Sequence, residues 1–145
     1  MFNVSIILGV DYGVKRLGIA IADTEIRIAL PLRMVPGRND VTRDAVAVAG
    51  IGETEDAAAF VVGLPLNMRE DGPTDSPQTT LTRRFAAELG RLSKKPVHFQ
   101  DECLTTQAAE EVLDAAGLAA RSRKRKLLTD IIAAQKILQA YLDAS

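Results

Sequence analysis

The chain has 145 residues, of which 47% are hydrophobic and 26% are charged. These values are ordinary for a globular protein and exclude a disordered chain, a fibre and a disulfide-stabilised miniprotein. The 18 Lys and Arg residues nearly balance the 19 Asp and Glu residues, which argues against nucleic-acid binding over the whole surface but allows a local basic patch. The length predicts a single domain that spans residues 1–145.

The single cysteine excludes an internal disulfide and is typical of a reducing compartment. No apolar run reaches the roughly 20 residues that a membrane-spanning helix needs. The first residues also lack the basic segment and cleavage site of a secretory signal. The sequence therefore predicts a soluble cytoplasmic protein with no membrane association.

The first third of the chain is predicted to form three strands and a helix. Two apolar, β-branched runs, Val4 to Asp11 and Leu17 to Ala22, flank a glycine-containing turn and predict a hairpin. Ile28 to Val35 predicts a third strand, because Pro and Gly follow it directly. The alanine-rich stretch 41–58 predicts a helix.

The remainder alternates between strands and helices. Phe60 to Leu64 predicts a short buried strand, and Asn67 to Pro77 is a polar segment that predicts a loop. The other expected elements are a strand at Val97 to Gln100 and helices at Thr79 to Leu92, Thr106 to Ala116 and Leu127 to Leu142. This order predicts an α/β fold with a mixed sheet flanked by helices.

Several acidic residues lie within or next to apolar segments, where removing a charged carboxylate from water costs free energy. Asp11 ends the first apolar strand, and Asp101 and Glu102 directly follow the strand at 97–100. At about 100° per residue, Asp130 falls on the apolar face of the last helix, where a carboxylate needs a hydrogen bond, an ion pair or a metal. A strand-end Asp can also simply cap a turn, and Asp130 can be a salt-bridged residue, so each acid alone leaves both interpretations open.

Together, these acids favour a metal site, because they can converge at one end of the sheet. Carboxylates without His or Cys partners suit hard cations such as Mg²⁺ or Mn²⁺. Two such ions can activate a water molecule and stabilise the leaving oxygen during phosphodiester cleavage. The acids therefore favour metal-dependent hydrolysis of a nucleic acid.

Basic residues near the acids are candidates for phosphate binding. Lys15 and Arg16 lie in the turn after Asp11, and the loop residue Asn67 is a further candidate for substrate contact. Just before the last helix, five of the 18 cations fall within six residues, a pattern that predicts substrate binding but also occurs in solvated loops. These five are Arg121, Arg123, Lys124, Arg125 and Lys126.

Four segments resemble motifs of the YqgF (RuvX) family of ribonuclease H-fold proteins. They are Leu8 to Asp23, Val61 to Met68, Asp101 to Thr106, and Asp130 to Gln139 followed by Tyr141-Leu142. The segments occur in the family's order and spacing, and the resemblance covers nearly the whole chain. Two departures stand out: Cys103 replaces the usual Arg, and the loop that follows Met68 does not continue with the usual Asp-Gly-Ser.

The resemblance implies a ribonuclease H-like fold whose five-stranded mixed sheet has the order 3-2-1-4-5. It implies a Mg²⁺- or Mn²⁺-dependent nuclease that matures the 5′ end of precursor 16S rRNA. The catalytic and metal-binding acids of the family then correspond to Asp11, Glu102 and Asp130, with Asp101 as an alternative to Glu102. These are the positions that the strand ends and the last helix already favour.

Three other functions stay open at this stage. One is a Holliday junction resolvase that acts on branched DNA, an activity named in an older family label. Paired cuts in a junction with approximate two-fold symmetry would favour a homodimer over a monomer. Another is a non-catalytic RNA-binding protein of ribosome assembly. The third is nucleotide binding, since Asp11-x-Gly13 resembles the phosphate loop of actin-like ATPases and sugar kinases, but those enzymes need two lobes and this chain supplies one.

Overall fold

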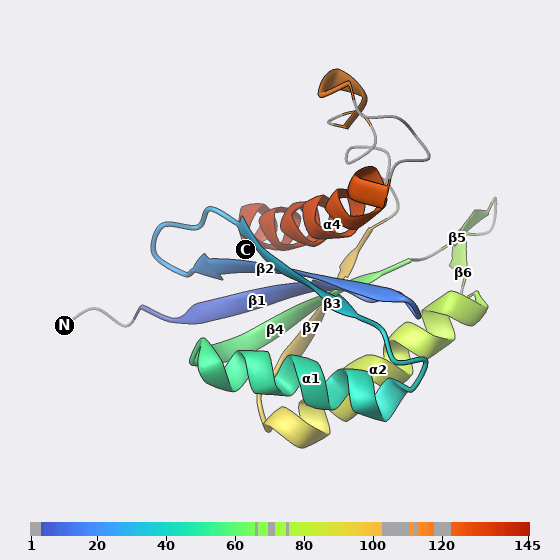
Figure 1. The fold of residues 1–145 in the computed structure, drawn as a ribbon. Helices are drawn as coiled ribbons and strands as arrows, with labels where there is room; N and C mark the ends of the chain where they lie inside the picture. The colour runs from blue at the N-terminus through green and yellow to red at the C-terminus, as the bar shows by residue number, and fades with distance from the viewer. Residues whose placement is uncertain are drawn as a thin grey trace.

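The computed structural model describes residues 4–65, 67–69, 72–74, 76–102, 111, 113–117 and 123–145. Its central sheet has five strands, and a separate two-stranded sheet projects beside one end of it (Figure 1). The strands are β1 (Ile6–Asp11), β2 (Arg16–Asp23), β3 (Leu30–Pro36), β4 (Ala57–Leu64), β5 (Asn67–Arg69), β6 (Gly72–Thr74) and β7 (Val97–Asp101). The helices are α1 (Val41–Thr54), α2 (Pro77–Ser93) and α4 (Arg123–Ala144).

The central sheet has the order β3-β2-β1-β4-β7. β1 pairs antiparallel with β2 and parallel with β4, while β7 pairs parallel with β4. Because β7 is the fifth strand of this sheet in chain order, the predicted mixed sheet with the order 3-2-1-4-5 is confirmed. β1, β4 and β7 all end at the same edge of the sheet, which we call the carboxyl edge.

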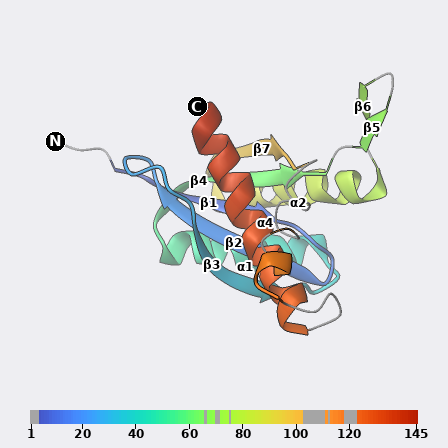
Figure 2. The same ribbon diagram turned by 90° about the horizontal axis from the view of Figure 1, so that it is seen from above.

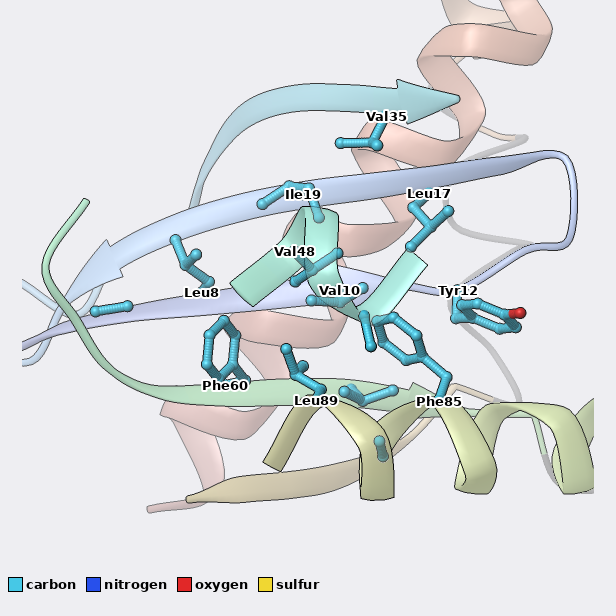
Figure 3. Packing of buried hydrophobic residues seen from close by; sticks show 14 residues of the cluster. Leu8, Val10, Tyr12, Leu17, Ile19, Val35, Val48, Phe60, Phe85 and Leu89 are labelled. Atoms are coloured by element: carbon cyan, nitrogen blue, oxygen red, sulfur yellow. The ribbon is translucent and has the colours of Figure 1, made fainter. Parts of the chain in front are cut away.

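Helices cover both faces of the sheet. α1 and α2 lie on one face, and α4 crosses the other face over β1 and β2 (Figures 1 and 2). Phe60, Phe85 and Leu89 fill the core on the α1–α2 side (Figure 3), and burial of each such side chain stabilises the fold by about 1.5–3 kcal/mol. On the opposite face, Ile137 and Leu138 of α4 pack against the sheet.

Helix caps and strand pairing explain where α1 and α2 begin and where α1 ends. The Asp40 side chain accepts a hydrogen bond from the Arg43 backbone, and Ser76 caps α2 ahead of Pro77. The helix predicted over 41–58 ends at Thr54, because Ala57 and the residues after it pair with β1. Tertiary pairing thus overrides the helix propensity of these alanines.

The predicted loop from Asn67 to Pro77 contains a short hairpin, so that prediction was wrong in this segment. Asn67 pairs with Thr74 and Arg69 with Gly72. The Gly and Pro of β6 concealed this strand in the sequence, because both residues are rare inside strands.

The last helix begins earlier than predicted. α4 starts at Arg123 rather than Leu127, because Arg and Lys are good helix formers and extend the helix beyond its apolar pattern. The helix expected at Thr106 to Ala116 falls mostly outside the described residues. Residues 111 and 113–115 are helical, and Gly117 follows with a φ of 75°. No helix in the described part of the chain is long and apolar enough to cross a membrane.

Candidate active site

The carboxyl edge of the sheet brings the predicted acids together. Asp11 ends β1, and Glu102 directly follows β7, where its backbone N–H donates to the Leu64 carbonyl at 3.3 Å. β4 lies between these two strands, so the Glu102 side chain must cross β4 to reach Asp11. Parallel pairing of β1, β4 and β7 therefore produces the convergence that the sequence predicted.

Gly63 on β4 provides the space for this crossing. A Cβ atom at this position would lie 2.5 Å from Oε2 of Glu102 and 2.3 Å from Cδ1 of Ile137. Because both distances are far below van der Waals contact, any side chain at Gly63 would displace the Glu102 carboxyl group. The glycine leaves Glu102 free to form a side-chain hydrogen bond with Asp11.

The surroundings of Asp11 and Glu102 raise the pKa values of both carboxyl groups. Burial raises the pKa of Asp11 well above its ordinary value, and the nearby charges of Glu102 and Asp130 raise it further. Burial also raises the pKa of Glu102, although the hydrogen bond from Asp11 opposes that rise. The hydrogen bond between the two carboxyl groups thus raises the pKa of Asp11 and lowers that of Glu102, so Asp11 is the group whose pKa rises more.

The chain just after Asp11 is held in place by α2. The Tyr12 ring is buried and stacks on Phe85 with 4.5 Å between ring centroids (Figure 3). The Tyr12 carbonyl accepts a hydrogen bond from Nε2 of Gln78 at 3.2 Å. These contacts fix the backbone that carries Asp11, so its carboxyl group projects from a rigid strand end.

Asp130 reaches the same region from α4. Its backbone lies over Gly18, where an added Cβ would lie only 1.9 Å from the Asp130 carbonyl oxygen. Gly18 is in turn the β2 residue directly paired with Asp11. The helix thus rests on the sheet backbone beside Asp11, and the three predicted catalytic acids lie at one place.

The Asp130 carboxylate is bonded to Arg16 in this arrangement. Nε of Arg16 donates to Oδ2 of Asp130 at 2.7 Å, and the side chains are 35% and 20% exposed respectively. Burial raises the pKa of Asp130, while the hydrogen bond from Arg16 lowers it. Asp101, the predicted alternative to Glu102, lies exposed at the end of β7, where its charge raises the pKa of Glu102.

The donor chemistry of this site fits a hard divalent cation. Asp11 and Glu102 present oxygen atoms only, and a buried carboxylate pair is stabilised by a nearby positive charge. Asp130 is committed to Arg16, and no three His, Cys, Asp or Glu side chains in the described ranges are arranged to hold one ion together. Asp11 and Glu102 therefore fit Mg²⁺ or Mn²⁺ as the structure stands, and Asp130 lies beside them.

The predicted phosphate-binding residues have different surroundings. Lys15 is exposed in the turn at the carboxyl edge, and Lys124 is exposed on the first turn of α4. Arg125, by contrast, is 5% exposed and donates to Oδ1 of Asp114 at 2.7 Å. The local charge pattern did not indicate that Arg125 is buried and bonded to an acid of the same chain.

The remaining predicted residues cannot be assigned a side-chain role from the structure. Arg121 lies outside the described residues, as does Cys103. Asn67 begins β5, and Arg123 and Lys126 lie in the first turn of α4, but only their backbones are described. Sequence reasoning did not single out Gly18 or Gly63, and a lone glycine inside a predicted strand is the signal that could have indicated a close approach.

Comparison with known proteins finds relatives over nearly the whole chain. The profile of the RuvX family, described as Holliday junction resolvase, matches residues 5–144. A protein from Chloroflexus aggregans is 39% identical over 142 residues, which covers 98% of this chain and 96% of that relative. One from Rhodobacter capsulatus is 40% identical and covers 97% of this chain and 85% of the relative. Both are named as proposed pre-16S rRNA nucleases.

Solved structures of Thermus thermophilus RuvC share the fold. One, in complex with a Holliday junction substrate, has a TM-score of 0.57 at 16% identity and covers 97% of this chain and 94% of that one. Another has a TM-score of 0.55 at 18% identity and covers 96% and 95%. The fold is ribonuclease H-like, as the sequence predicts, and the chain belongs to the RuvX family.

Proposed function

We propose that this protein is a divalent-metal-dependent nuclease that hydrolyses phosphodiester bonds in precursor 16S rRNA. The observation that carries the proposal is the half-buried Asp11–Glu102 carboxyl pair at the carboxyl edge, with Asp130 and Arg16 beside it. Desolvated acids with raised pKa values are typical of functional sites. The names of the related proteins suggest the RNA substrate.

In this proposal, Asp11, Glu102 and Asp130 hold Mg²⁺ or Mn²⁺. Bound ions of this kind supply an activated water molecule and stabilise the leaving oxygen. Because burial raises the pKa of Asp11, its protonated form competes with metal binding, and loading of the site requires the ionised carboxylate. Metal affinity should therefore rise with pH.

The cations around the acids would position the RNA backbone. Lys15 and Arg16 lie in and just after the turn that follows Asp11, and Lys124 lies at the start of α4. Contacts to phosphates position a nucleic acid without reading its sequence. Asn67 and the basic residues Arg121, Arg123 and Lys126 stay predictions for the same role.

The test is cleavage of a precursor 16S rRNA fragment with Mg²⁺ or Mn²⁺. Asp11→Asn and Glu102→Gln should each lower the rate by at least about 100-fold, because even indirect support of a metal ligand contributes about 10- to 100-fold. Asp23→Asn is the matched control, since Asp23 pairs with Ile6 at the opposite edge of the same sheet, and it should cleave at the wild-type rate. Unchanged cleavage by Asp11→Asn would contradict the proposal.

A four-way DNA junction is the second substrate in this assay, because the family profile carries the description Holliday junction resolvase. Faster cleavage of the junction than of the RNA would favour that activity. RNA binding without cleavage by the wild type, unaffected by substitution of the acids, would favour a non-catalytic role.

A further inference from the structure

The ion pair between Arg16 and Asp130 links two residues that the proposed function uses separately. Nε of Arg16 lies 2.7 Å from Oδ2 of Asp130, across 114 positions of the chain. Both side chains are partly accessible, at 35% and 20% exposure. The contact is therefore close enough to hold the carboxylate and open enough for its partners to exchange.

The backbone positions around this pair are fixed. Asp130 rests on Gly18, which is paired with Asp11, while Arg16 lies two residues earlier on the same strand as Gly18. α4 cannot approach the sheet more closely, because the Asp130 carbonyl already occupies the space of a Cβ atom at Gly18. Because a closer approach of the helix is blocked, we expect the Asp130 carboxylate to change partner by rotation of its side chain.

The charges around Asp130 favour Arg16 as its partner when no metal is present. Asp11, Glu102 and Asp130 are three acids at one place, and Arg16 is the cation bonded to Asp130. At comparable distances, a divalent cation attracts a carboxylate twice as strongly as a guanidinium does. A cation bound beside Asp11 would also repel the Arg16 side chain.

We propose that Arg16 and the metal ion compete for Asp130. Arg16 holds the carboxylate in the metal-free protein and releases it when a divalent cation binds at Asp11 and Glu102. This inference rests on the proposed metal-dependent function and adds an order of events, in which Asp130 completes the site only after it leaves Arg16.

Release also frees Arg16 for the substrate. A guanidinium has five N–H donors in a planar fork that matches a phosphate group. A phosphate that takes up Arg16 in turn favours the separation of Arg16 from Asp130. Metal and RNA backbone should consequently strengthen each other's binding, since such coupling is reciprocal.

The direct test follows the Arg16 Nε–Hε group in proton–nitrogen correlation spectra, with Mg²⁺ alone as the probe. The signal is assigned by its loss in Arg16→Lys. In the metal-free wild type it should differ from the signal in Asp130→Asn, where the carboxylate is gone. During a Mg²⁺ titration, the wild-type signal should move to the Asp130→Asn position, with the same midpoint as the backbone amides of Tyr12 and Gly13.

Three results would overturn the inference in distinguishable ways. If those amides respond to Mg²⁺ while the Arg16 signal stays in place, the metal site exists but Arg16 does not compete for Asp130. If nothing near Asp11 responds to Mg²⁺, the proposed metal dependence fails and the inference fails with it. A metal-free signal identical to that of Asp130→Asn would also overturn the inference, because the pair would then be absent in solution.

A second measurement separates competition from simple charge repulsion. Arg16→Gln should bind Mg²⁺ about two- to fivefold more tightly than the wild type in calorimetric titration, a change expected from loss of one partly exposed ion pair. The matched control is Lys15→Gln, which removes the same charge from the adjacent position, where Lys15 is exposed. Equal changes in the two variants would contradict competition for Asp130.

Discussion

Asp11 and Gly18 face each other in the antiparallel ladder of β1 and β2. The first residue carries a half-buried carboxyl group, and the second has no side chain, so the backbone of α4 can lie directly beside that group. The small residue on β2 thus determines how close Asp130 comes to Asp11. This relationship makes the site dependent on the packing of α4 against the sheet.

Gly18→Ala is expected to destabilise the protein by about 1–3 kcal/mol or more, as other overpacked cores do. The new methyl group would overlap the Asp130 carbonyl oxygen, which lies 1.9 Å from the Cβ position. Unfolding in urea measures the loss, and the nuclease assay should show a parallel loss of activity because α4 must move away from β2.

The matched control for this substitution is Gly50→Ala. Gly50 is exposed inside α1, and nothing lies within 4 Å of its Cβ position. Alanine should therefore stabilise the helix there by about 0.5–1 kcal/mol. If both variants lost the same free energy of unfolding, contact between Gly18 and α4 would not be the cause.

Asp11→Asn is expected to be more stable than the wild type at neutral pH, although it should lose activity. Burial and the charge of Glu102 raise the pKa of Asp11 well above its ordinary value of 3.8. Its protonated form is therefore favoured in the folded protein, and stability is lost as the pH rises from 3.8 through the folded-state pKa. Asparagine carries no such charge and avoids this loss.

The checking measurement is the free energy of unfolding of both proteins between about pH 4 and pH 8. The advantage of Asp11→Asn should grow with pH over this window and then level off. Saturating Mg²⁺ should reduce the advantage, because a ligand that binds the folded wild type stabilises it by about 2.7 kcal/mol at 100 times its Kd. An advantage that shrinks as the pH rises would contradict the assigned environment of Asp11.

Gln139→Leu is expected to cost about 1–3 kcal/mol, because it leaves the buried backbone N–H of Ala29 without its partner. Oε1 of Gln139 accepts from the Ala29 backbone N–H at 2.9 Å, and its Nε2 donates to the Arg27 carbonyl at 3.1 Å. Ala29 is 1% exposed, so water does not readily replace the lost bond. Chemical denaturation measures the loss.

Lys136→Leu is the control on the same helix. Lys136 is exposed, so its replacement should change the free energy of unfolding by no more than about 0.5 kcal/mol. A similar loss in both variants would show that leucine on α4 destabilises the protein for reasons unrelated to the bonds of Gln139.

Local pattern was sufficient to find the sheet and most of the candidate site. Asp11 and the pair Asp101-Glu102 were candidates because an acid at the end of an apolar strand is unusual, and Asp130 because it falls on the apolar face of its helix. The resemblance to the family then favoured Glu102 over Asp101. The hairpin at Asn67–Arg69 and Gly72–Thr74 was missed, since its Gly and Pro residues indicate a loop. The start of α4 was placed too late, because charged residues lack the apolar periodicity that marked the helix.

The sequence by itself determined the strands of the sheet and the acids at the strand ends, and its resemblance to the family implied the order of the strands. The tertiary structure decided the partners: Glu102 crosses Gly63 to Asp11, Asp130 bonds to Arg16, and Arg125 bonds to Asp114. The physical reason is the range of the forces involved. The alternating and helical patterns in the sequence reflect local interactions between residues a few positions apart. The Arg16–Asp130 bond instead joins positions 114 residues apart and forms only after α4 has packed on the sheet.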